Sequence, residues 1–175
     1  MNLIVGAPWW LAALLVLILL AAAVEDAVRF RISNITCLGV CCCAIVAMAL
    51  NGFPLALWQN LVVFALVLTI GTAAFAAGWL GGGDVKLIAA TGLWFGFRSA
   101  VALIAAILIA GGIVAVVYIA ARSVRRIGSE SKNRDGRIPY GIAVVAGTLL
   151  VIAIQLTSKP VNSFDDVRAR AFKYR

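Results

Sequence analysis

The chain has 175 residues, of which 64% are hydrophobic and only 13% charged, and its mean hydropathy is +1.07. Soluble domains are about 45–50% apolar and about 25% charged, so this composition excludes a soluble globular domain, a disordered chain and a fibrous repeat. The net charge of +8 comes from 15 basic and 7 acidic residues, and histidine is absent. The basic residues lie between apolar runs. The positive-inside rule and attraction to anionic membrane lipids therefore explain the net positive charge better than binding to nucleic acid does.

Six apolar segments follow one another along the chain, over residues 3–24, 35–50, 55–80, 85–97, 99–121 and 138–156. A membrane-spanning helix needs about 20 predominantly apolar residues, and the fourth segment is too short to cross alone. We therefore predict an all-α fold, a polytopic transmembrane helical bundle with about six membrane segments. Residues 1–157 would form one transmembrane domain, and residues 158–175 a basic C-terminal tail.

Lysine and arginine in the short loops predict the orientation of this bundle. The loop after the first segment carries Arg29 and Arg31, the loop after the third carries Lys86, and the loop after the fifth is rich in basic residues. If all segments cross, these loops share one side, which we place in the cytoplasm. The basic tail then lies on the side opposite the cytoplasm, which the positive-inside rule disfavours.

Four cysteines, at Cys37, Cys41, Cys42 and Cys43, lie inside one apolar run without a CxxC pair. A zinc site needs spaced ligands and a polar second shell. We interpret these cysteines as small apolar packing residues, and we predict neither a metal site nor a cofactor.

The seven acids fall into two groups. Four lie in hydrophilic stretches among basic residues, where we interpret them as solvated charge; these are Glu130, Asp135, Asp165 and Asp166. The other three, Glu25, Asp26 and Asp84, fall at the predicted cytoplasmic ends of apolar segments. An acid at a membrane boundary is costly and indicates a functional site.

Two carboxylates that face each other in a partly dry site cannot both ionise easily, so one keeps a proton. The charged acid can take a proton from water while the protonated one donates to a peptide carbonyl, which is an acid–base pair for amide hydrolysis without metal, histidine or serine. Neighbours on a helix point about 100° apart, so only one of Glu25 and Asp26 can face Asp84. Geometry favours the shorter Asp26 without excluding Glu25.

Three glycines, Gly81, Gly82 and Gly83, directly precede Asp84. Consecutive glycines break a helix and let the backbone approach another chain, so this segment could pair with an extended peptide. With Lys86 they are candidate substrate-binding residues. The alternatives are a flexible loop with Asp84 as a helix N-cap and a lysine that snorkels to the membrane surface.

Three motifs together resemble those of the prepilin peptidases. Residues 26–34, an aspartate followed by a basic stretch and Ile-Ser-Asn, resemble the first aspartate motif of that family, with Ser33 where the family has proline. Residues 81–87 resemble its GxGD motif, and residues 137–141 are similar to its Pro-Tyr-Gly segment. The motifs occur in the family's order.

The resemblance implies an aspartic endopeptidase of the bacterial cytoplasmic membrane that removes the short basic leader of prepilin or pseudopilin precursors at the cytoplasmic face. Asp26 and Asp84 would be its catalytic aspartates. Larger members add a cytoplasmic domain with two zinc-binding CxxC pairs and methylate the new N-terminus. This chain has neither feature, so it resembles the short, peptidase-only form of the tight-adherence (Flp-type) pilus, and we expect no methyltransferase activity.

Two other classes of protein remain open at this point. A small proton- or ion-coupled transporter would also have boundary acids and a broken glycine-rich segment, although the chain shows no convincing internal repeat. A structural subunit of a secretion machine would not need the acids.

Overall fold

The computed structural model describes residues 2–52, 55–126 and 140–157, and within these ranges every regular element is helical. This confirms the predicted all-α fold. The elements are α1 (Leu3–Gly6), α2 (Trp9–Arg29), α3 (Asn34–Leu50), a 3-10 turn (Leu55–Leu57), α4 (Trp58–Ala76), α5 (Gly82–Gly92), α6 (Phe97–Arg126) and α7 (Tyr140–Thr157). The loop acids, the predicted tail 158–175 and residues 137–139 lie outside the described residues.

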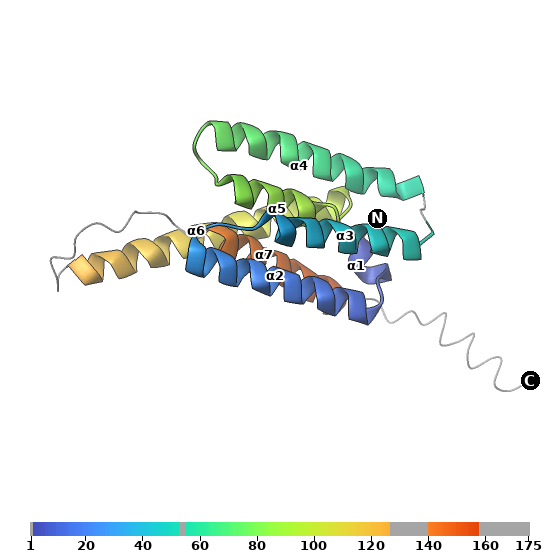
Figure 1. The fold of residues 1–175 in the computed structure, drawn as a ribbon, viewed down its shortest axis with the longest axis horizontal. Helices are drawn as coiled ribbons and strands as arrows, with labels where there is room; N and C mark the ends of the chain where they lie inside the picture. Colours follow the sequence, from blue (N-terminus) through green and yellow to red (C-terminus); the bar gives the residue numbers. More distant parts are fainter. Residues whose placement is uncertain (1, 53–54, 127–139, 158–175) are drawn as a thin grey trace, which may run out of the picture.

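The helices from α2 to α7 alternate in direction, as Figure 1 shows. Four of the described helices are long and apolar enough to cross a membrane, namely α2, α4, the first 25 residues of α6 and α7, while α3 is shorter at 17 residues. The chain is therefore a helical membrane protein. The α2–α3 and α4–α5 connections lie at the same end of the bundle (Figure 1), so Arg29, Arg31 and Lys86 share an end as predicted.

The first apolar segment is not one helix, which corrects the predicted span 3–24. The chain breaks at Ala7 and Pro8, and Pro8 is the N-cap of α2. A proline is tolerated at a helix start because the first N–H groups have no helical partner. Helix α2 then continues to Arg29, so Asp26 lies within its last turn.

The fourth segment is a half-length helix buried inside the bundle. Helix α5 has 11 residues, or about 16 Å at 1.5 Å per residue, about half of the hydrocarbon thickness. It packs against α3, α4 and α7. Polar contacts hold the segment that follows it: Asn60 Nδ2 donates to the Leu93 carbonyl at 3.0 Å, and the Trp94 side chain donates from Nε1 to the Val40 carbonyl of α3 at 3.3 Å.

Helices α6 and α7 approach each other closely at Gly147. A Cβ atom added there would lie 2.7 Å from the Ile107 backbone nitrogen. Small residues allow such close packing between helices in lipid, where apolar burial alone provides no driving force. All four cysteines are free thiols. Cys37 and Cys43 are buried in the core and Cys41 packs against it, as expected of packing residues, whereas Cys42 is exposed.

This close approach predicts that Gly147→Ala destabilises the bundle. The added methyl group would force two backbones apart, and overpacking of this kind costs about 1–3 kcal/mol. The free energy of unfolding, measured by SDS titration and circular dichroism, should fall accordingly. The control is Gly112→Ala on α6, where a Cβ meets nothing within 4 Å; equal losses for both variants would contradict this account.

Candidate active site

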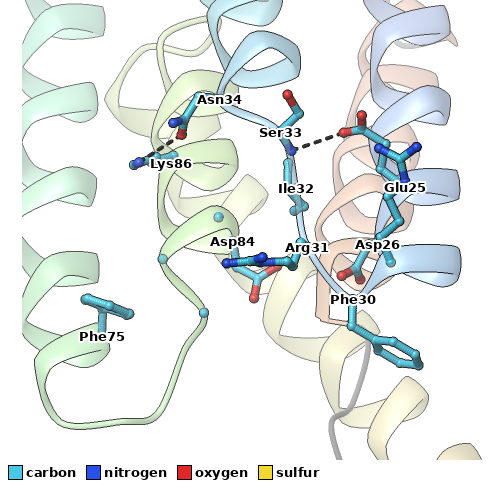
Figure 2. A pocket seen from close by; sticks show the side chains of 14 residues that line it. Glu25, Asp26, Phe30, Arg31, Ile32, Ser33, Asn34, Phe75, Asp84 and Lys86 are labelled. Carbon is cyan, nitrogen blue, oxygen red and sulfur yellow. Dashed lines mark hydrogen bonds between the residues drawn. The ribbon is translucent and has the colours of Figure 1, made fainter.

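A pocket of about 820 Å³ opens at the end of the bundle where the α2–α3 and α4–α5 connections meet. Its walls come from the end of α2, the linker 30–33, the start of α3, the end of α4 and the start of α5 (Figure 2). The pocket contains three acidic and three basic residues, which are Glu25, Asp26, Asp84, Arg29, Arg31 and Lys86.

Asp26 lies on the pocket-facing side of the last turn of α2, and its side chain is only 5% exposed. The backbone N–H of Ile142 donates to Asp26 Oδ2 at 3.3 Å. This donor is available because the first N–H groups of a helix have no partner within the helix, and α7 begins at Tyr140. The positive end of the α7 dipole also favours a negative charge here.

Gly141 is what permits this contact. A Cβ atom at that position would lie 2.8 Å from both Cγ and Oδ2 of Asp26 and 2.8 Å from Cδ1 of Ile32. Any side chain would therefore push α7 away from the carboxylate. The role of Gly141 and Ile142 was missed from the sequence, although the Pro-Tyr-Gly segment was the signal that could have indicated it.

Asp84 is the third residue of α5 and is 9% exposed. The N-cap of α5 is Gly81, in an extended conformation, so the alternative that Asp84 is itself the N-cap is wrong. The Asp84 side chain turns back toward Gly81, where an added Cβ would lie 2.7 Å from Oδ2. An acid in the first turn is favoured by the helix dipole.

The glycine run differs from the predicted helix break. Gly82 and Gly83 belong to α5, and the reversal of the chain occurs earlier, at Gly78 with φ +77°. Gly83 serves a close contact instead, since an added Cβ there would lie 3.1 Å from Ile32 Cβ, whereas at Gly82 it would make only an ordinary 3.4 Å contact with the Phe75 ring. Of the three glycines, Gly81 alone has an extended backbone.

The two aspartates lie 58 residues apart in the sequence, on α2 and α5, and line one pocket (Figure 2). Burial raises the pKa of Asp84 from 3.8 to about 6, the nearby Asp26 carboxylate adds to this rise, and a hydrogen bond from the Gly81 backbone opposes it. Desolvation and a like charge both disfavour the ionised form. One carboxyl group of the pocket can therefore hold a proton up to about pH 6.

Two further charged residues of the pocket, Lys86 and Glu25, have protein partners. Lys86 Nζ donates to Asn34 Oδ1 at 2.9 Å, so it is linked to the start of α3 (Figure 2). Glu25 accepts hydrogen bonds from Ser33 N–H and Thr36 Oγ1. Among the described residues, no three His, Cys, Asp or Glu side chains come together as a metal site would require.

The fold and the pocket define a class: a polytopic helical membrane protein with two buried aspartates at one end of the bundle. Residues 13–118 match the model of the type IV leader peptidase family, and the chain belongs to this family. It is thus a peptidase of a family whose substrates are prepilins. Comparison with curated proteins and with solved structures gave no match.

The raised pKa of Asp84 predicts a pH-dependent effect of Asp84→Asn on stability. Because the folded state binds the proton more tightly than the unfolded state, wild-type stability falls as pH rises from about 4 to about 6. The neutral asparagine avoids this loss, so the variant should unfold at a higher temperature than wild type at pH 7 and show no such gain at pH 4. Thermal unfolding in detergent at both pH values tests this; an equal difference at both would contradict it.

Proposed function

We propose that the chain is an aspartic endopeptidase that removes the leader peptide of Flp-like type IV prepilin precursors. One observation carries this proposal: the buried carboxyl groups of Asp26 and Asp84, from separate helices, line a single pocket. Membership of the type IV leader peptidase family supports the choice of substrate.

In the proposed mechanism Asp26 is the general base and Asp84 the general acid. Asp26, whose Oδ2 accepts a hydrogen bond from the Ile142 N–H, takes a proton from water as the water oxygen attacks the peptide carbon. Asp84, whose pKa is raised to about 6, is the protonated partner and donates its proton to the carbonyl oxygen. The tetrahedral gem-diol collapses when the proton on Asp26 passes to the leaving amine and the C–N bond breaks. A gem-diol hydroxyl returns its proton to Asp84 as the carboxylic acid forms, which restores the pair.

The substrate is proposed to be a single-span precursor whose leader reaches the pocket from the cytoplasm. Basic residues at the pocket end, with Arg29 at the end of α2 and Arg31 in the α2–α3 connection, support this orientation. Lys86 offers a cation at the pocket wall, and Gly81, Gly82 and Gly83 line the same wall without side chains, which leaves room for the peptide. The Gly81 N–H already bonds the Asp84 carboxylate and its carbonyl accepts from the Val85 N–H, so Gly81 would contribute space and not backbone pairing.

The peptidase-only form is supported by the connection between α2 and α3. It consists of residues 30–33 alone, so it holds no zinc-binding domain of the kind that the larger, methylating members carry at this place. We therefore propose that the chain cleaves its precursor without methylating the product.

Replacing either aspartate by asparagine should abolish cleavage. Asparagine keeps the shape of the side chain but cannot exchange a proton, and loss of general acid–base catalysis costs about 10²–10⁴-fold in rate. Purified protein in lipid, incubated with a Flp-type prepilin precursor, gives the rates of wild type, Asp26→Asn and Asp84→Asn. Asp165→Asn makes the same chemical change in the C-terminal segment and should cut like wild type. If either active-site variant cuts at the wild-type rate, the two-aspartate mechanism is wrong.

Gly141→Ala tests the placement of Asp26 without altering its chemistry. The new methyl group would displace the Asp26 carboxylate, because its position lies 2.8 Å from Oδ2, and misplacement by about 1 Å can cost about 10²-fold in rate. Gly111→Ala is the control, since a Cβ there makes only an ordinary 3.9 Å contact with Ala143. Equal cleavage rates for the two variants would show that Asp26 does not depend on α7.

A further inference from the structure

Glu25 precedes Asp26 by one residue, but its carboxylate is directed at α3 (Figure 2). Oε2 accepts a hydrogen bond from the Ser33 N–H at 3.1 Å and another from Thr36 Oγ1 at 2.9 Å. Ser33 is the N-cap of α3, and Thr36 lies in its first turn. Hydrogen bonds to a charged acceptor are the stronger kind, and a negative group suits a helix N-terminus. One carboxylate thus ties the end of α2 to the start of α3.

The linker between these ends is short and strained. Phe30 adopts a left-handed conformation with φ 51°, which is unfavourable for a residue with a bulky side chain. Its N–H donates to the Asp26 carbonyl at 2.9 Å, so the strained residue is attached directly to the turn that carries Asp26. A reversal of this kind persists when surrounding contacts hold both of its ends, and Glu25 supplies such a contact.

Ile32, in the same linker, lies between α5 and α7. Its side chain would meet a Cβ at Gly83 at 3.1 Å and a Cβ at Gly141 at 2.8 Å. Gly83 is followed directly by Asp84, and Gly141 lies against the Asp26 carboxylate. Ile32 therefore lies between the start of α5, which carries Asp84, and the start of α7, which contacts Asp26.

We propose that Glu25 is a positioning residue for the Asp26–Asp84 pair. By holding Ser33 and Thr36 it fixes the linker, and through Ile32 the linker sets how the two carboxyl groups face each other. Glu25 does not itself exchange a proton with substrate in this proposal. The inference rests on the proposed function, in that the aspartate pair performs the cleavage.

Two matched pairs of variants test the proposal. Glu25→Gln keeps a carbonyl oxygen that can accept both hydrogen bonds, whereas Glu25→Ala removes the acceptor. Thr36→Ser keeps the hydroxyl donor, whereas Thr36→Val removes it with little change in shape. The kcat and KM for a prepilin precursor are measured in lipid, with rates normalised to folded protein from size-exclusion chromatography.

We expect Glu25→Ala to lower kcat by about 10- to 100-fold, the range that misplacement of reacting groups produces, with little change in KM. Glu25→Gln should stay within about threefold of wild type, because its oxygen replaces the lost acceptor. Thr36→Val should lower kcat less than Glu25→Ala, and Thr36→Ser should behave like wild type. If Glu25→Ala does not fold, the Thr36 pair decides the question.

Three results would overturn the proposal. If Glu25→Gln is as inactive as Asp26→Asn, the Glu25 charge takes part in the chemistry and Glu25 is not a positioning residue. If Glu25→Ala and Thr36→Val lower the yield of folded protein but leave kcat unchanged, the contacts are structural only. If wild type itself does not cut, the proposed function fails, and this inference fails with it. That result is distinguishable from the other two because no variant then differs from wild type.

Discussion

A carboxylate buried at the end of an apolar bundle needs hydrogen-bond donors, and the start of α7 supplies one. An unpaired buried charge costs several kcal/mol, and the Ile142 N–H at the start of α7 meets Asp26 at 3.3 Å. Gly141 lets the helix come that close, and Gly147, six residues further on, lets α6 pack against the same helix. The close contacts of α7 thus combine one electrostatic need with two missing side chains.

The sequence carries the outline of the fold because long apolar runs and the placement of charge are strong signals. They correctly predicted an all-helical bundle, and they correctly brought Arg29, Arg31 and Lys86 to one end of it. The meeting of Asp26 and Asp84 in one pocket also agrees with the prediction, since both were placed at the same membrane face. Their catalytic roles stay a prediction until cleavage is measured.

Other features depend on contacts between distant residues, which hydropathy does not reveal. The end of α5 is contacted by Asn60, 33 residues earlier, whose Nδ2 donates a hydrogen bond to the Leu93 carbonyl. The glycines before Asp84 were expected to free the backbone, but Gly83 instead makes room for Ile32. A glycine in a sequence indicates that space is needed but does not indicate which residue fills that space. For the same reason the role of Gly141 could not be predicted.

The turn after α5 has a consequence for handling the protein. Its backbone is covered by side chains and by the N-terminal helix α1, whose Leu3 N–H donates to the Trp94 carbonyl at 3.0 Å. Lipid cannot replace that hydrogen bond, because hydrocarbon offers no donor. An affinity tag joined close to Leu3 would lie beside this hydrogen bond and could displace it. The residues around Leu3 are therefore a poor site for fusion.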